Sequence, residues 1–236
     1  MMKRRKLIFK GVLCIALFGT TATLATRLHA ASSELTRELI NAGITLKGAV
    51  IDIRYAGENN FLGRPVQGYE AAECWLSQEA TKALLTAQRL AEADGFALMI
   101  FDCYRPQRAV DDFVQWVGGD ESEPTKTVYY PNISRKELIE RGYIASRSGH
   151  SRGSTVDVSL FDAKSGEHAD MGTPWDYFDK RSHTDNTQIS KAASENRQTL
   201  KDIMERAGFR GYYAEWWHFT LQNEPFPNTY FDVPIE

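Results

Sequence analysis

The sequence predicts a single α+β domain in which helices pack on a mainly antiparallel sheet. Its 236 residues are enough for one domain with a hydrophobic core of its own. Helix-like and strand-like patterns are interspersed along residues 31–236, and this part of the sequence has no internal repeat, linker or low-complexity segment. One domain is therefore expected to cover residues 31–236.

The first part of this domain is expected to form a strand, a loop and a helix in that order. Residues 50–55 alternate well enough for a short strand, and residues 59–68 have the composition of a loop. Ser77 is a good helix cap, and the apolar residues after it repeat at helical spacing as far as Gly95. This helix is expected to serve packing, not chemistry.

A buried strand and a second helix should follow. Residues 96–101 are continuously apolar, which predicts a central strand. Pro106 stands where a helix begins, and the helix should stop at Gly118. Arg105 is thereby held at a strand-to-helix junction, where a side chain can point into a site. An ion pair with Asp111 or Asp112 is the alternative use of its charge.

The middle of the domain combines a short helix with a strand. Ser134 and Glu137 form a capping-box pattern for a helix ending at Gly142. Residues 155–161 alternate in polarity, which predicts a strand. In that strand Asp157 should lie on the face directed away from the core.

The last part of the domain is expected to hold an irregular loop at residues 171–176, a helix through residues 200–207 and a closing strand at 216–221. Residues three apart face opposite sides of a regular strand. Glu215 and His218 therefore point into one site only if Glu215 lies in a turn or a bulge.

The N-terminal residues 1–30 are predicted to be a secretory signal peptide. A basic start at residues 3–6 precedes a run of apolar and small residues, and Ala30 ends the segment at the expected cleavage position. An uncleaved membrane anchor is the alternative, although the run is short for a span of about 20 residues. Leu13 before Cys14 argues against a lipoprotein signal, and the Arg4-Arg5 pair leaves twin-arginine export open beside the Sec route. We expect a periplasmic or secreted protein with no stable membrane insertion after cleavage.

The charge of the processed chain argues against nucleic acid as a partner. The whole sequence has 28 Lys and Arg against 31 Asp and Glu. Residues 1–30 contain six of the basic residues and none of the acidic ones, so 22 basic and 31 acidic residues remain, a net charge of −9. A surface of this charge repels phosphate backbones.

Two cysteines, Cys74 and Cys103, remain after removal of the signal peptide. In an oxidising compartment an even pair suggests a disulfide, and two buried thiols are the alternative. Cys74 lies just before the Ser77 helix and Cys103 lies at the exit of the strand that follows it. A hairpin of this helix and strand would bring the two cysteines together.

Two polar clusters have the residue types of a metal site. His150 and Asp157 stand seven residues apart across a glycine-containing segment, and Glu215 precedes His218 by three residues. Two histidines and one aspartate leave the fourth zinc position open, as catalytic sites do, and the remaining glutamate is a candidate base. Each cluster alone is more often an ordinary hydrogen-bonded pair than a ligand pair.

Four blocks of sequence resemble a known family. The segments SGHSRGSTVDVSL, DMGTPWD and EWWHF, with FDCYRP upstream, look like the signature blocks of the zinc D-alanyl-D-alanine dipeptidases, the group that includes the vancomycin-resistance dipeptidases. The similarity runs from about Tyr55 to the C-terminus. It implies a DD-peptidase or hedgehog-like fold and one Zn²⁺ per chain, bound by His150, Asp157 and His218.

The resemblance also implies roles for further residues. Glu215 matches the general base that takes a proton from the activated water, and Arg105 matches the arginine that stabilises the anionic tetrahedral intermediate. Asp176 and Tyr69 match residues that bind the substrate ammonium, and Ser148 matches the residue that binds its carboxylate. The alternatives are a turn former for Asp176 and a half-buried loop aromatic for Tyr69.

The expected function is hydrolysis of the small dipeptide D-Ala-D-Ala by an exported zinc enzyme, in cell-wall turnover or dipeptide scavenging. A DD-carboxypeptidase or endopeptidase acting on longer peptidoglycan peptides would use the same zinc apparatus. A catalytically silent, zinc-stabilised binding module is a rival from another class. Glu215 and Arg105 argue against that rival, because a pure binder needs neither.

Overall fold

The computed structural model describes residues 38–120 and 124–236. The predicted signal peptide, residues 1–30, lies outside the described residues. The strands are β1 Leu39–Asn41, β2 Val50–Ile51, β3 Trp75–Ser77, β4 Phe96–Asp102, β5 Thr155–Asp162, β6 Glu167–His168, β7 Phe209–Tyr212 and β8 Glu215–Leu221. The helices are α2 Gln78–Ala93, α3 Gln107–Val117, α4 Lys126–Tyr129, α5 Arg135–Glu140 and α6 Lys191–Arg206, with 3-10 turns η1 Ala42–Ile44, η2 Arg54–Ala56, η3 Gly149–Arg152 and η4 Lys180–Ser182.

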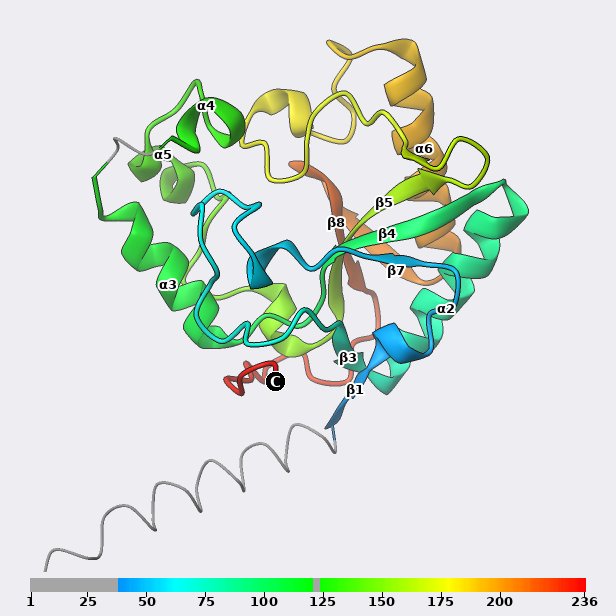
Figure 1. Ribbon diagram of the computed structural model, residues 1–236, viewed down its shortest axis with the longest axis horizontal. Coiled ribbons are helices and arrows are strands. Elements are labelled where there is room, and N and C mark those ends of the chain that lie inside the picture. Colours follow the sequence, from blue (N-terminus) through cyan, green and yellow to red (C-terminus); the bar gives the residue numbers. More distant parts are fainter. Residues whose placement is uncertain (1–37, 121–123) are drawn as a thin grey trace, which may run out of the picture.

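A mixed sheet forms the centre of the domain (Figure 1). Its strands follow the order β2-β4-β5-β8-β7, and β6 pairs with the end of β5. The β2–β4 pairing is parallel and the other pairings in this sheet are antiparallel. A separate two-stranded sheet joins β1 to β3. The predicted α+β fold with a mainly antiparallel sheet is confirmed.

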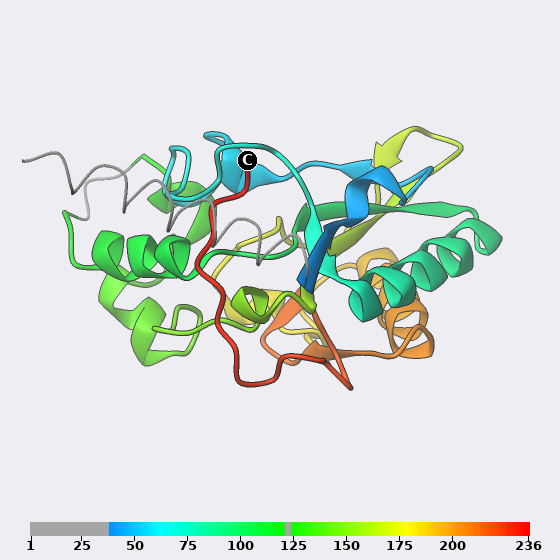
Figure 2. The same ribbon diagram turned by 90° about the horizontal axis from the view of Figure 1, so that it is seen from below.

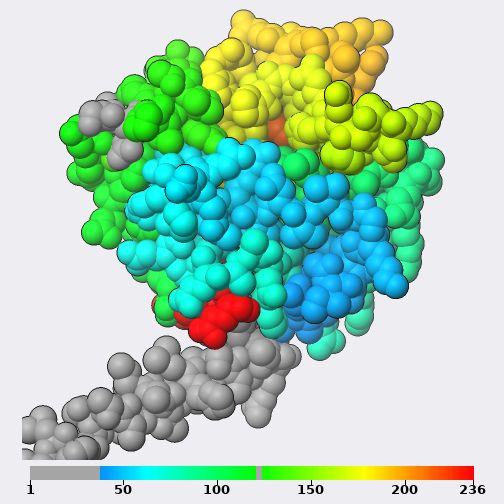
Figure 3. Space-filling view, viewed as in Figure 1, coloured from blue at the N-terminus to red at the C-terminus, as the bar shows by residue number. Residues whose placement is uncertain are grey.

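Helices α2 and α6 lie side by side against the sheet, as Figures 1 and 2 both show. Helix α2 contacts β4, and α6 contacts β5, β7 and β8. Helices α3, α4 and α5 gather at the opposite end of the molecule (Figure 1). In the space-filling view the segment from about residue 40 to 75 covers much of the visible face (Figure 3). Within the described ranges, no helix combines the length and the apolar character that a membrane span requires.

The longer predicted elements are confirmed. Ser77 caps α2, because its Oγ accepts a hydrogen bond from the backbone N–H of Ala80 at 3.2 Å. The predicted apolar stripe of α2 faces the core, where Leu84 is fully buried. Ser134 and Glu137 form the expected capping box at α5.

The predicted strand at residues 50–55 is shorter than expected. It pairs with β4 only at Val50 and Ile51, and the chain turns into η2 at Arg54. The register of β4 against β5 shifts between Ile100 and Asp102, just past the residue that Ile51 faces. The regular pairing of β2 with β4 therefore ends at Ile51. Pro106 differs in a smaller way: it is the capping residue of α3 and not its first helical residue.

Candidate active site

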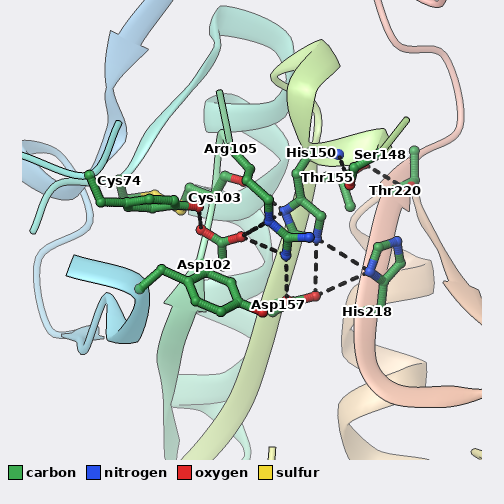
Figure 4. Close-up of polar contacts among 12 residues, drawn as sticks. Cys74, Asp102, Cys103, Arg105, Ser148, His150, Thr155, Asp157, His218 and Thr220 are labelled. Atoms are coloured by element: carbon green, nitrogen blue, oxygen red, sulfur yellow. Dashed lines mark hydrogen bonds and ion pairs between the residues drawn. A yellow bond between two sulfur atoms is a disulfide. The ribbon is translucent and has the colours of Figure 1, made fainter. Parts of the chain in front are cut away.

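Three side chains from different elements meet at one point beside the sheet (Figure 4). Asp157 on β5 pairs directly with His218 on β8, so the two side chains lie opposite one another on one face. The Oδ1 atom of Asp157 lies 3.2 Å from Nδ1 of His218 and 3.3 Å from Nε2 of His150. The two ring nitrogens are 3.3 Å apart. The three residues predicted as metal ligands are thus brought together. Among the described residues they are the group of His, Cys, Asp or Glu side chains close enough to hold one metal ion.

The turn before β5 explains how His150 reaches Asp157. Residues 149–152 form η3, which ends at Gly153 with φ +74°, in the left-handed region. A Cβ atom on Gly153 would lie 2.4 Å from Cδ2 of Leu39. A glycine is therefore required for the chain to fold back from η3 into β5 and to place His150 over the strand.

The protonation of the site fits a bound cation. Nδ1 of His150 lies 2.7 Å from the carbonyl oxygen of Cys103, which can only accept a hydrogen bond, so this nitrogen carries the proton. Nε2 of His150 consequently faces the site. Burial lowers the pKa of His218, which favours its neutral form. Nε2 of His150 and Nδ1 of His218 therefore both lie beside one carboxylate oxygen.

Asp157 supplies the clearest sign that the cluster is incomplete on its own. Its side chain is 2% exposed, and its Oδ1 atom is buried without a hydrogen-bond donor among the described residues. Burial alone would raise the pKa of Asp157, but His150 and His218 beside it lower the pKa overall, so the carboxylate is ionised. A buried anionic oxygen without a donor is costly unless a cation neutralises it.

The environment of Asp157 corrects one expectation. Its strand alternates as predicted, but the face on which Asp157 lies is buried, not directed away from the core. Trp175, in the irregular segment after β6, covers this face and places its Nε1 atom 3.4 Å from Oδ2 of Asp157. The sheet therefore has a second buried side, formed by loops that periodicity alone does not place.

Arg105 points into the site from the loop between β4 and α3. Its Nε and Nη2 atoms lie 2.9 and 2.8 Å from Oδ2 of Asp102. Nη2 also lies 3.6 Å from Oδ2 of Asp157. The alternative ion pair with Asp111 or Asp112 is wrong, because Asp112 binds Arg64 and Arg105 turns toward the sheet. Two aromatic rings, Tyr55 and Phe113, each lie 5.0 Å from the guanidinium carbon.

A bulge in β4 directs Asp102 toward this arginine. The pairing of β4 with β5 shifts between Ile100 and Asp102, so Asp102 comes to lie opposite Asp157. Bulges often re-aim side chains beside active sites. Asp102 is fully buried, and Figure 4 shows it between Arg105 and the disulfide.

Glu215 reaches the same site from the start of β8. The pairing of β7 with β8 shifts at Tyr212, which is the irregularity that lets Glu215 and His218 share one side. Oε2 of Glu215 lies 3.5 Å from Nδ1 of His218, and the residue is only 8% exposed. Burial raises the pKa of Glu215 well above its usual range, and the charges of Asp157 and Asp176 add to this effect.

A cavity of about 300 Å³ opens onto these side chains. Arg105, Asp157, Glu215 and His218 line it together with Ser148 and Asp176. Ser148 caps η3, where its Oγ accepts the N–H of His150 at 3.3 Å. The volume is at the small end of the range for ligand pockets. It suits a small ligand.

Asp176 is held in an unusual backbone conformation at the inner wall of this cavity. Its φ of +57° is the one positive value found for a non-glycine residue in the described ranges. Its Oδ2 atom accepts a hydrogen bond from the hydroxyl of Tyr55 at 2.6 Å. Burial raises the pKa of Tyr55, so this hydroxyl stays protonated and donates. Burial also raises the pKa of Asp176 well above its usual range.

The tyrosine beside Asp176 is Tyr55, and sequence reasoning missed it. Tyr69, which the resemblance assigned to the substrate ammonium, is absent from the residues that line the cavity. Its hydroxyl donates to Oδ1 of Asp102 at 2.6 Å, behind Arg105. Tyr55 carried no local signal of its own, since it follows a short strand as many core tyrosines do.

The predicted disulfide between Cys74 and Cys103 is present, with the two Cα atoms 5.2 Å apart. Cys103 follows Asp102 directly, and its carbonyl oxygen accepts the hydrogen bond from His150. The disulfide therefore ties the strand exit that carries Asp102 and Arg105 to the segment before α2.

Comparison with known proteins gives one consistent family. The family model described as Peptidase_M15, D-ala-D-ala dipeptidase, matches residues 36–236. D-alanyl-D-alanine dipeptidases of Enterococcus faecium and Streptomyces coelicolor are 46% and 48% identical over 78% of this chain, covering 92% and 91% of their own lengths. The dipeptidase of Escherichia coli is 32% identical over 79% of this chain and 86% of its own. A solved D,D-pentapeptidase, VanY in complex with Zn(II), is similar at a TM-score of 0.39 and 14% sequence identity, and the match covers 64% of this chain and 74% of that one.

Proposed function

This chain belongs to the D-ala-D-ala dipeptidase family, and from that membership we propose that it hydrolyses D-alanyl-D-alanine with one Zn²⁺ held by His150, Asp157 and His218. The observation that carries the proposal is the convergence of two imidazole rings on a buried carboxylate oxygen that has no hydrogen-bond partner among the described residues. Two nitrogens and one oxygen form a donor set that suits zinc and leaves a coordination position open. Bound there, Zn²⁺ would polarise the scissile carbonyl and lower the pKa of a water molecule.

Glu215 is the proposed general base. Its carboxylate oxygen lies 3.5 Å from the ring nitrogen of His218, so it borders the place where water and substrate would meet. It takes a proton from the attacking water and passes it to the departing amine nitrogen. Burial shifts the pKa of Glu215 upward, toward neutral pH, where a group can both accept and release a proton.

Arg105 is the proposed stabiliser of the oxyanion that develops on the carbonyl. Its guanidinium is fixed by Asp102, packed against aromatic rings and only 12% exposed. A charge fixed in this way needs no reorganisation during the reaction. No covalent intermediate with the enzyme is required.

The ends of the cavity fit the two charges of a free dipeptide. Asp176 offers a buried carboxylate for the substrate ammonium, with Tyr55 beside it. Burial disfavours the ionised carboxylate in the free protein, and an incoming ammonium group compensates for that cost. Ser148, which caps η3, offers its hydroxyl to the substrate carboxylate.

Substrate length separates this function from that of a carboxypeptidase or endopeptidase. Asp176 is only 4% exposed, which leaves little room for a chain beyond the substrate amine. We predict that the purified protein hydrolyses D-Ala-D-Ala at least about 100-fold more efficiently than its N-acetyl derivative, because blocking the amine leaves a buried carboxylate unpaired. A pentapeptide stem serves as the longer substrate. Faster cleavage of the pentapeptide would assign the protein to the carboxypeptidase class instead.

Export is part of the proposal. The predicted signal peptide of residues 1–30 and the Cys74–Cys103 disulfide both support an oxidising compartment. An exported dipeptidase meets dipeptides released outside the cytosol. Cell-wall turnover or dipeptide scavenging is the role that follows.

A further inference from the structure

Two arginines line the cavity, and only one of them has its charge paired within the described part of the chain. Arg105 is bound by Asp102 and approaches Asp157. Arg147 also lines the cavity, one residue before Ser148, and its side chain is exposed. Among residues 38–120 and 124–236, no carboxylate lies within ion-pair distance of Arg147. Its positive charge is therefore left for something that enters the cavity.

The other charges of the cavity make this arginine significant. Asp157, Asp176 and Glu215 all lie on the wall. The proposed function assigns them to the metal, the substrate ammonium and the attacking water, so none of them balances the substrate carboxylate, and the neutral Ser148 hydroxyl supplies one hydrogen bond but no charge. A free dipeptide carries such a carboxylate two bonds beyond its scissile nitrogen. Arg147 is the cation on the wall that can balance it.

The C-terminal segment holds Arg147 in place without neutralising it. The guanidinium carbon of Arg147 lies 4.8 Å from the centre of the Tyr230 ring. Arg152 approaches the same ring at 5.7 Å and binds Glu224 through two hydrogen bonds of 2.7 and 2.8 Å. The backbone N–H of Phe231, next to Tyr230, donates to the carbonyl oxygen of Ser151 at 2.8 Å. The segment that carries Tyr230 is thus fixed to η3, beside the metal ligand His150.

We propose that Arg147, held on the ring of Tyr230, receives the C-terminal carboxylate of the dipeptide beside Ser148. This inference rests on the proposed dipeptidase function and adds a substrate-positioning residue to it. The Oγ atom of Ser148 accepts the N–H of His150, so its own hydroxyl hydrogen remains available for the same carboxylate. Arginine suits the task because its planar fork binds a carboxylate through two parallel hydrogen bonds.

The test compares Arg147→Gln with the wild-type enzyme on two substrates, D-Ala-D-Ala and its C-terminal amide. On the free dipeptide we expect KM to rise about tenfold while kcat stays within about twofold, because a charge-assisted contact to the ground state and transition state alike is lost. On the amide, which lacks the carboxylate, the variant and the wild type should have equal kcat/KM. If Arg147 had a merely structural role, the variant would lower kcat/KM equally for both substrates.

Three further variants sharpen the comparison. Arg147→Lys keeps the charge and should recover part of the lost affinity, whereas Tyr230→Ala should raise KM in the same direction by releasing the guanidinium. Arg89→Gln removes an exposed arginine from α2, outside the cavity lining, and should leave KM unchanged. Unchanged KM for the dipeptide in Arg147→Gln, with an active wild type, would overturn the inference alone. An inactive wild type would instead refute the proposed function and the inference with it.

Discussion

Glu215 is the residue whose role is easiest to isolate, because an amide has nearly the shape of its carboxylate. Glu215→Gln should retain the fold and bound zinc but lose about 10²–10⁴-fold in kcat, since the amide cannot accept the proton of the attacking water. Steady-state rates together with zinc content measured by atomic emission check this. Glu140→Gln on α5, where the side chain is 58% exposed, is the matched control. A rate near that of the wild type would remove Glu215 from the mechanism.

Arg105 can be tested by keeping its charge and removing its planar fork. In Arg105→Lys the single ammonium group reproduces neither the contact with Asp102 nor the fixed position over the Tyr55 ring. We expect kcat/KM to fall about 10²–10³-fold, and the melting temperature, measured alongside, to report the cost of weakening the buried contact with Asp102. Arg89→Lys provides the conservative control on a surface helix. Equal efficiency in both variants would mean that Arg105 serves structure alone.

Residues differ in how much of their role the sequence contains. The convergence of His150, Asp157 and His218 was predictable, because each lies in a short polar cluster of metal-binding residue types. Tyr55 was not, because its partner Asp176 lies 121 residues away in sequence. Asp102 was not, because it lies opposite Asp157 only through the irregular pairing of β4 with β5. Tyr69 shows the same limit, since resemblance located a tyrosine but the fold decided which tyrosine stands beside Asp176.

At the scale of elements, the disulfide between β4 and the segment before α2 gives a test of stability. It closes a loop with a sequence separation of 29. Replacing both Cys74 and Cys103 by Ala should cost roughly 3–4 kcal/mol in the chain-entropy model, or about 10 °C in Tm for a domain of this size. Calorimetry of the oxidised protein and the double variant measures the difference.

The same double variant should also bind zinc less tightly, because the disulfide braces the backbone at residue 103, whose carbonyl oxygen fixes the ring of His150. Disturbing such an outer contact costs about tenfold in metal affinity in comparable sites. Equal melting temperatures for the oxidised protein and the variant, or two titratable thiols in exported protein, would contradict the structural role of the disulfide.

Elements with strong local signals were predicted correctly, and short paired elements were not. The capping box of α5 and the apolar run of β4 are local properties of the sequence. Strands β1, β3, β6 and β7 are only two to four residues long, so their identity depends on a partner strand more than on composition. The bulges at Asp102 and Glu215 also follow from pairing, although the need for one at Glu215 could be inferred from its spacing to His218.

The whole molecule explains why the candidate metal site is buried although it lies on the polar face of a strand. Helices α2 and α6 cover part of the sheet, and the segment carrying Trp175 covers the Asp157 face. Periodicity in β5 predicted two faces but not that both would be covered. A candidate site enclosed in this way keeps bulk water away from the buried carboxylates around it, which strengthens their interactions.

The central claim, that one zinc ion held by His150, Asp157 and His218 makes the protein a D-Ala-D-Ala dipeptidase, is tested most directly by a metal titration of activity. Protein stripped with a chelator and verified to be metal-free should be inactive on D-Ala-D-Ala. Activity should rise in proportion to added Zn²⁺ and level off at about one equivalent per chain, whereas the variants His150→Ala, Asp157→Ala and His218→Ala should neither retain zinc at this ratio nor recover. Full hydrolysis by the verified metal-free protein, or wild-type zinc content in all three variants, would contradict the claim.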